Sequence, residues 1–248
     1  MGKLMSFWGM LLISLLGGWS VNVVADALPS QRTLRETWRT PLWSLPATWI
    51  QSVGLALPAR SDTKHGTPAS TLRYRVVFFA AFLLGWLALI RNLEPLSTIV
   101  LAIQAWFFLA IAVIDLEHRL VLNRMLLFAL PFVLLGNALL GIPSLTSALL
   151  GGAAGFGFFL LLAVMAPGAM GMGDVKLAGF IGLLTGLSGV MMALFWGILT
   201  GGIAGGVVLI RNRFRRGNTL AYAPYLVLGT WIFLFNVVET VHLYLERL

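Results

Sequence analysis

Residues 177–210 read LAGFIGLLTGLSGVMMALFWGILTGGIAGGVVLI, a run of 34 residues without an ionisable side chain. As one helix this run would be about 50 Å long, well beyond the ~30 Å hydrocarbon core of a bilayer. Further apolar segments lie at residues 4–25, 76–91, 95–114, 125–142, 145–166 and 222–245. We therefore expect the long run to be split around Leu184–Gly189 (LTGLSG), which gives about eight transmembrane helices.

The composition excludes a soluble globular domain. Only 10% of the residues are charged and 59% are hydrophobic, whereas ordinary soluble domains carry about 25% charged residues. The fold class predicted is therefore an all-α polytopic membrane protein. The chain contains no cysteine, which excludes disulfides, thiolate metal ligands and a cysteine nucleophile.

The distribution of basic residues predicts the orientation. If loops alternate from the first span, residues 26–75, 115–124, 167–176 and 211–221 share one side and hold all but three of the 17 Lys and Arg residues. The three exceptions are Lys3, Arg91 and Arg247. By the positive-inside rule the basic side is cytoplasmic and both termini lie on the outer side. The net charge of +8 then reflects contact with membrane lipids, and no nucleic-acid partner is expected.

Three carboxylates stand out at the predicted cytoplasmic boundary, and one of them, Asp26, ends the first span. Asp115 ends the third span in FFLAIAVIDLEHRL, and Asp174 opens the sixth in GAMGMGDVKLAGF. Ionisable groups at a membrane edge are costly and are candidates for function. Because two spans separate Asp115 from Asp174, both fall on one face at similar depth. Two alternatives remain open: Asp174 as a helix N-cap, and Asp115 as the salt-bridge partner of Arg119.

Two adjacent carboxyl groups suit hydrolysis of a peptide bond. Both cannot ionise cheaply, so they share one proton. One then acts as a base on water and the other as an acid on the leaving amine. This is the chemistry of aspartic proteases.

Four segments carry a resemblance to a known family. GMGDVKL (171–177) resembles the G-x-G-D-x-K-L signature of type IV prepilin peptidases, and IDLEHRLVLN (114–123) resembles their first aspartate segment. GGWSVNVVADALP (17–29) and YAPYLVLG (222–229) are similar to two further segments, in the family order.

The resemblance implies a function. These peptidases are multi-pass aspartic endopeptidases of the bacterial inner membrane that remove the basic leader of type IV prepilins or pseudopilins at the cytoplasmic face. Asp115 and Asp174 match the two catalytic aspartates, and Gly171, Gly173 and Lys176 match the rest of the second motif. The glycines would let the loop that carries Asp174 move. Proteolysis needs no cofactor, and S-adenosylmethionine would be used if the N-methyltransferase activity of many members is retained.

Some positions depart from the family pattern. The usual paired CxxC motifs are absent, so no metal site is expected and methylation is in doubt. Leu122 and Asn123 stand where Pro and Asp are common, and Ala27 stands where Arg is common.

The predicted domains are residues 1–29 with the first span and motif, residues 30–75 as a cytoplasmic loop without zinc ligands, and residues 76–248 as a seven-span catalytic domain. The alternative for the N-terminus is a signal peptide cleaved at Ala25-Asp26-Ala27.

Two other functions compete with this interpretation. Gly186-Leu187-Ser188-Gly189 spells the GxSG motif of rhomboid serine proteases, with His242 on the same outer side. A non-enzymatic transporter or scaffold would instead use Asp115 and Asp174 to relay protons or to pair helices. Transport sites, however, usually lie near the midplane of the membrane.

Overall fold

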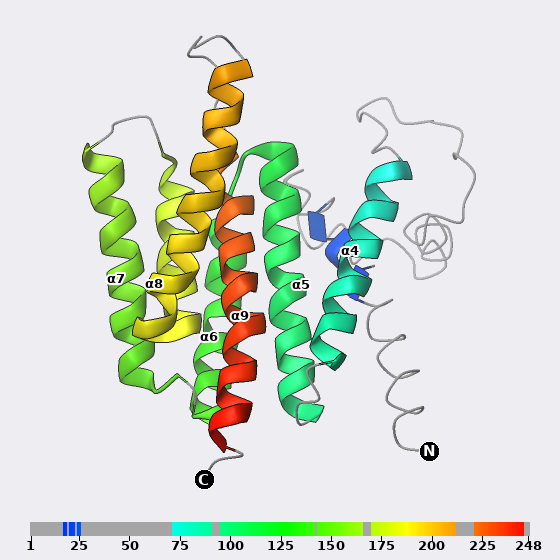
Figure 1. The fold of residues 1–248 in the computed structure, drawn as a ribbon, viewed down its shortest axis with the longest axis vertical. Helices are drawn as coiled ribbons and strands as arrows, with labels where there is room; N and C mark the ends of the chain where they lie inside the picture. The colour runs from blue at the N-terminus through cyan, green and yellow to red at the C-terminus, as the bar shows by residue number, and fades with distance from the viewer. Residues whose placement is uncertain are drawn as a thin grey trace. The chain divides into compact units, whose positions relative to one another are not determined.

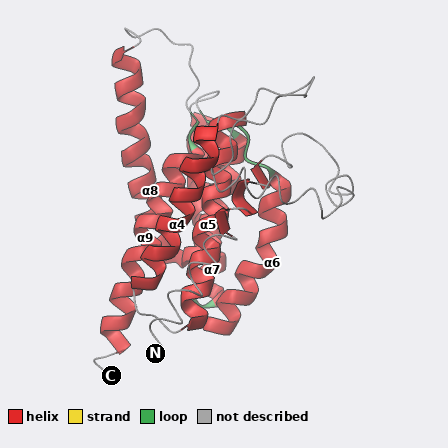
Figure 2. Cartoon of the chain, turned by 90° about the vertical axis from the view of Figure 1, so that its right-hand side faces the viewer, coloured by secondary structure: helices red, strands yellow, loops and turns green. Residues whose placement is uncertain are grey.

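The computed structural model describes residues 17–18, 20–22, 24–25, 71–90, 95–141, 143–165, 170–211 and 221–245. Every regular element within these ranges is a helix (Figure 2), which confirms the all-α prediction. The helices are α4 (Thr71–Ile90), α5 (Pro95–His118), α6 (Asn123–Leu140), α7 (Leu145–Met165), α8 (Met172–Arg211) and α9 (Ala223–Leu245). The described residues between 17 and 25 are also helical.

The chain forms two compact units, Met1–Val113 and Ile114–Leu248. In the first unit, the indole N–H of Trp106 on α5 donates a hydrogen bond of 2.9 Å to the carbonyl of Ala81 on α4. The second unit contains the end of α5 and all of α6 to α9. The predicted loop 30–75 falls almost entirely outside the described residues, so the division into residues 1–29, 30–75 and 76–248 stays a prediction.

Within the described residues, three helical segments are long and apolar enough to cross a membrane: Leu96–His118, Leu145–Met165 and Met172–Val208. Shorter apolar helices occupy Arg75–Ile90, Asn123–Ala138 and Ala223–Phe235. Large apolar side chains cover their outer faces; Phe128 of α6 is 73% exposed. Such a surface suits lipid tails better than water.

Helix α8 is broken at Gly186, inside the range where a split was predicted. This residue has φ 73° and ψ −179°, a conformation that glycine adopts without the steric cost of a side chain. The chain doubles back there (Figure 1), so that α8 consists of a first arm, 172–185, and a second arm, 187–211. Both ends of α8 therefore lie at the same end of the second unit.

Neighbouring helices satisfy the backbone groups that the break releases. In an unbroken helix the carbonyl of Leu183 would accept from the N–H of Leu187. Instead, the Asn137 amide of α6 donates to the Leu183 carbonyl over 2.9 Å, and the Leu187 N–H donates to the Ser147 hydroxyl of α7 over 3.1 Å. Because unpaired backbone groups are costly in lipid, these two polar side chains stabilise the bend.

Glycines set the distance between the arms of α8 and their neighbours. A Cβ at Gly151 of α7 would lie 2.5 Å from the Gly182 carbonyl oxygen, so α7 and the first arm are in backbone contact. On the second arm, a Cβ at Gly197 would lie 3.0 Å from the Leu226 side chain of α9. Small residues allow this close approach where lipid provides little drive for helix association. The resulting bundle brings the end of α5 and the starts of α6, α8 and α9 to one end of the second unit (Figure 1).

Candidate active site

Asp115 lies near the end of α5 and is buried, with 5% of its surface exposed. Its Oδ2 accepts a hydrogen bond of 3.1 Å from the backbone N–H of Ala223, the first residue of α9. The N-terminal N–H groups of a helix have no partner within the helix and carry partial positive charge. The start of α9 therefore supplies both a donor and a favourable field to this carboxylate.

The chain turns sharply after Asp115. Arg119 adopts φ 53° and its N–H donates to the Asp115 carbonyl over 2.8 Å, which ends α5. The positive charge of Arg119 also acts on the Asp115 carboxylate, while a salt bridge between the two side chains stays a prediction. The Asp115 carboxylate also accepts a hydrogen bond from the N–H of Ala223, a partner that the alternative of an Arg119 salt bridge did not include.

Asp174 is the third residue of α8, because the helix begins at Met172. The N-cap interpretation of Asp174 is therefore wrong: Gly171 holds that position and accepts the Asp174 N–H over 3.1 Å. The carboxylate reaches back to hydrogen-bond the backbone of Gly171. An acidic residue at the third helical position makes the same contact in a capping box. The contact holds the carboxylate at the N-terminal end of α8.

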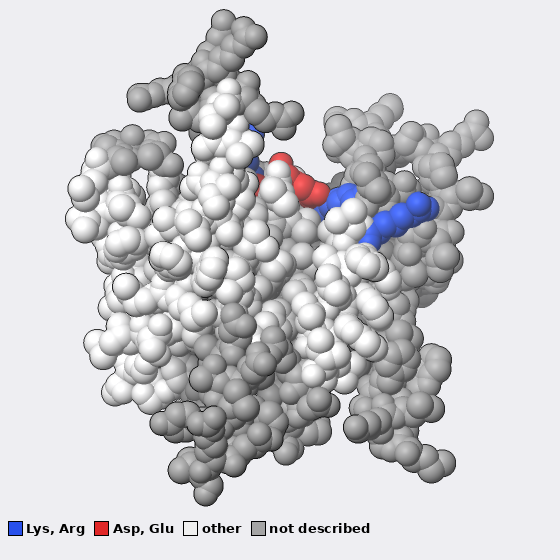
Figure 3. Space-filling model, viewed as in Figure 1, with Lys and Arg blue, Asp and Glu red and all other residues white. Residues whose placement is uncertain are grey.

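The two carboxylates interact electrostatically. They come from separate segments, the end of α5 and the start of α8, that meet only in the folded chain. In Figure 3 the acidic side chains visible in that view gather at the upper end. Two carboxylates that influence each other in this way suit hydrolysis of an amide by an acid and a base, which needs one of them to carry a proton.

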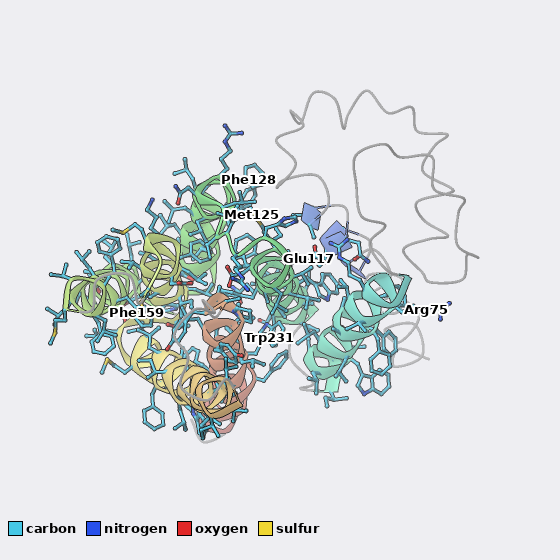
Figure 4. All side chains as sticks on the ribbon, turned by 90° about the horizontal axis from the view of Figure 1, so that it is seen from above. Arg75, Glu117, Met125, Phe128, Phe159 and Trp231 are labelled. Carbon is cyan, nitrogen blue, oxygen red and sulfur yellow. The ribbon has the colours of Figure 1, made fainter. Side chains whose placement is uncertain are left out.

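Tyr222 is a third polar group beside the pair. Burial and, next, the negative charge of Asp174 raise the pKa of the Tyr222 phenol above its usual value. Its ring lies 6.2 Å from the ring of Phe159 on α7, which Figure 4 labels, and 6.4 Å from that of Tyr225. A phenol is protonated at neutral pH with or without this rise, so Tyr222 carries a hydroxyl that can donate a hydrogen bond.

The other residues of the GMGDVKL segment shape and tether the loop. A Cβ at Gly173 would lie 3.0 Å from the Cβ of Val121, so glycine allows the start of α8 to approach the segment after α5. Lys176 donates from Nζ to the Asn123 Oδ1 at the start of α6 over 3.1 Å. Neither Gly171 nor Gly173 has a positive φ, so the visible role of Gly173 is close packing, and loop movement stays a prediction.

The sequence analysis assigned no role to Tyr222, Ala223 or Asn123. Tyr222 and Ala223 open the YAPYLVLG segment, whose quoted similarity was the available signal. Asn123 was noted only as a departure from the family pattern, yet it is the partner of Lys176.

The remaining candidates lie elsewhere. Ser188 is exposed beside the bend at Gly186, whereas Asp174 lies in the first turn of the same helix. The bend of α8 points away from the end where α8 starts (Figure 1). The side chain of His242, together with Asp26, is outside the described residues. His118 is exposed, with its Nε2 3.9 Å from Glu117.

The described residues offer no evident place for a metal or for S-adenosylmethionine. No group of three His, Cys, Asp or Glu side chains comes together within the described ranges. Among the described side chains the carboxylates are Asp115, Glu117 and Asp174. Two of them form the pair, which leaves Glu117, with a side chain 32% exposed and 3.9 Å from His118, as the single carboxylate that could face a ribose or a sulfonium, a poor fit.

Part of the chain, including both aspartates, matches the model of a known protein family. Residues 102–206 match the model of the type IV leader peptidase family, a range that includes both Asp115 and Asp174. The chain is similar to three proteins that each bear the name prepilin leader peptidase/N-methyltransferase. The protein from Bacillus subtilis is 33% identical over 120 residues, which are 48% of each chain. That from Pseudomonas aeruginosa is 29% identical over 57% of this chain and 50% of its own. That from Aeromonas salmonicida is 28% identical over 77% of this chain and 68% of its own.

These matches confirm the resemblance predicted from the motifs. The chain spans about half the length of the first curated relatives that it matches. No solved structure matches it.

Proposed function

We propose that this chain is a membrane-embedded aspartic endopeptidase that removes the basic leader of type IV prepilins or pseudopilins. The observation that carries the proposal is the interacting pair Asp115 and Asp174 within the segment that matches the type IV leader peptidase family. The names of the similar proteins supply the substrate class.

In the proposed reaction, the ionised carboxylate of the pair takes a proton from a bound water molecule. The water oxygen attacks the carbonyl carbon of the scissile peptide. The protonated carboxyl gives its proton to the departing amine, the C–N bond breaks, and the pair returns to its shared-proton state. The Ala223 N–H holds Asp115 and the backbone of Gly171 holds Asp174, so both carboxyl groups are oriented before substrate binds.

The proposed topology has eight spans, with both termini outside and the pair at the cytoplasmic face of a bacterial inner membrane. The doubling back of α8 at Gly186 supports two spans within that helix. The described basic side chains of the second unit belong to Arg119, directly after α5, and to Arg124 and Lys176, near the starts of α6 and α8. These helix ends lie at one end of the unit (Figure 1), and the positive-inside rule makes such a basic end cytoplasmic.

Methylation of the new N-terminus is not part of the proposal. The similar proteins carry N-methyltransferase in their names, but the described residues of this chain fit S-adenosylmethionine poorly. No step is assigned to that group.

The proposal is tested by co-expression with a prepilin in cells that lack their own peptidase. Wild type is compared with Asp115→Asn and Asp174→Asn, because asparagine keeps the size of the side chain and removes the acid. We expect uncleaved prepilin with both variants, while immunoblotting finds each variant in the membrane. Normal cleavage by either variant would refute the proposed pair.

A further inference from the structure

Tyr222 stands directly before α9 and shares a peptide unit with the N–H that binds Asp115. The carbonyl of Tyr222 accepts the first backbone bonds of α9, from the N–H of Tyr225 over 3.1 Å and from that of Leu226 over 3.4 Å. The N–H of the same peptide unit belongs to Ala223 and donates to Asp115 over 3.1 Å. Because a peptide unit is planar and rigid, the position of Tyr222 sets where this donor lies.

The ring of Tyr222 packs against side chains from two helices and against the backbone of a third. Its centroid lies 6.2 Å from that of Phe159 on α7, a fully buried ring, and 6.4 Å from that of Tyr225 on α9. A Cβ at Gly201, on the second arm of α8, would lie 2.8 Å from the ring atom Cε2 and 3.2 Å from Cζ. Since carbon atoms in contact are normally about 3.5–4.0 Å apart, the ring fills the space that a side chain at Gly201 would take.

Two neighbouring glycines on the second arm of α8 have different surroundings. Gly201 faces the Tyr222 ring, whereas a Cβ at Gly202 would meet nothing within 4 Å. One turn earlier, a Cβ at Gly197 would lie 3.0 Å from the Leu226 side chain, so the arm stays close to α9 along this face. The backbone of α8 therefore limits the movement of the ring on one side, and α7 limits it on another.

We propose that Tyr222 is a positioning residue whose ring, packed against Gly201 and Phe159, holds the Ala223 N–H where it can bind Asp115. The inference rests on the proposed peptidase function. The ring acts through the backbone, and the phenolic hydroxyl has no part in this role. The bond of 3.1 Å is close to the upper limit of about 3.2 Å for N–H···O bonds, so a displacement of about half an ångström would break it.

The first test compares purified wild type, Gly201→Ala and Gly202→Ala in lipid nanodiscs with a prepilin substrate. The methyl group of Gly201→Ala displaces the Tyr222 ring, so kcat per folded enzyme should fall about fivefold or more with little change in KM. Gly202→Ala adds the same methyl group in open space and should retain the wild-type kcat. A wild-type kcat for Gly201→Ala would overturn the inference.

Variants of Tyr222 itself separate the ring from the hydroxyl. The conservative variant Tyr222→Phe keeps the ring and should cleave prepilin within about threefold of wild type. Tyr222→Leu removes the aromatic packing and should lower kcat about fivefold or more. Equal losses in the two variants would show that the hydroxyl acts, and would overturn the inference.

A double-mutant cycle with Ala223→Pro distinguishes positioning from a general structural defect. Proline has no N–H, so in this background the ring has no donor left to position. Gly201→Ala should therefore lower the kcat of Ala223→Pro by no more than about twofold. If the two losses multiply instead, the substitutions act independently and the inference fails.

Hydrogen exchange of the Ala223 amide provides a measurement that does not depend on activity. The first N–H groups of a helix have no acceptor within the helix, so the bond to Asp115 protects this one. Exchange should be about fivefold or more faster in Gly201→Ala than in Gly202→Ala. If the two rates are equal while Asp115→Asn is inactive, only the inference fails; if Asp115→Asn still cleaves prepilin, the proposed function fails.

Discussion

The backbone N–H of Ala223 donates a hydrogen bond of 3.1 Å to the Oδ2 of Asp115, across 108 residues of sequence. The bond joins the end of α5 to the first residue of α9 and is buried. An anion that lies at the end of its own helix faces an unfavourable dipole. The start of α9 offsets this by presenting an N–H of opposite polarity.

The first prediction removes that donor. Ala223→Pro should lower kcat about 10- to 100-fold, because proline lacks the N–H but is well tolerated as the first residue of a helix. The measurement is cleavage of prepilin by purified protein at equal amounts of folded enzyme. Ala223→Gly keeps the N–H and should cleave within about threefold of wild type. Equal rates for the proline and glycine variants would show that the bond to Asp115 does not assist the reaction.

The second prediction concerns the contact between α7 and α8. Gly182→Ala places a methyl group against the backbone of Gly151, so it should destabilise the protein by about 1–3 kcal/mol. The matched control is Gly157→Ala on α7, where a Cβ meets nothing within 4 Å. Thermal unfolding in detergent compares the two. If both variants melted at the same temperature, the glycine contact would not be stabilising.

The third prediction addresses the bend at Gly186. Ser147→Ala leaves the Leu187 N–H without its observed partner, and Asn137→Leu does the same to the Leu183 carbonyl. The bond from Leu187 is exposed and the one to Leu183 is part-buried, but lipid offers an unpaired polar group no substitute partner, so each substitution should cost about 1–3 kcal/mol. Unfolding midpoints measured in nanodiscs provide the check.

The control for the bend is Ser188→Ala, which removes an exposed hydroxyl in the same region. It should preserve both stability and prepilin cleavage. Complete loss of cleavage in this variant would favour the rhomboid-like alternative with Ser188 and His242.

The fourth prediction concerns the tether between Lys176 and Asn123. Lys176→Ala should reduce kcat about 2- to 10-fold, since the bond of 3.1 Å helps to hold the start of α8, which carries Asp174. Asn123→Asp keeps an oxygen acceptor and adds charge. The two side chains are exposed, so the interaction of Lys176 with the new carboxylate should be stronger by no more than about 1 kcal/mol. The Asn123→Asp variant should therefore cleave prepilin at the wild-type rate. A wild-type rate for Lys176→Ala would show that the tether is dispensable.

The sequence by itself determined the helical class and the approximate places of the apolar helices, and it singled out the two carboxylates as candidates. Long uninterrupted apolar runs predict helices, because a helix pairs all the backbone N–H and C=O groups of such a segment within the segment itself, as lipid requires. The 34-residue run was too long for one span, and the break falls at Gly186, within the predicted LTGLSG segment. The aspartates could be found because charge is rare and costly in apolar sequence.

Only the tertiary structure decided what each carboxylate touches. The N-cap interpretation failed because the sequence does not fix which residue starts a helix to within one turn, and α8 begins at Met172. Ala223, the partner of Asp115, and Asn123, the partner of Lys176, come from other helices. Hydrogen bonds and charge interactions depend on separations of a few ångströms, and these separations follow from how α7, α8 and α9 pack at their glycines, not from the order of residues along the chain.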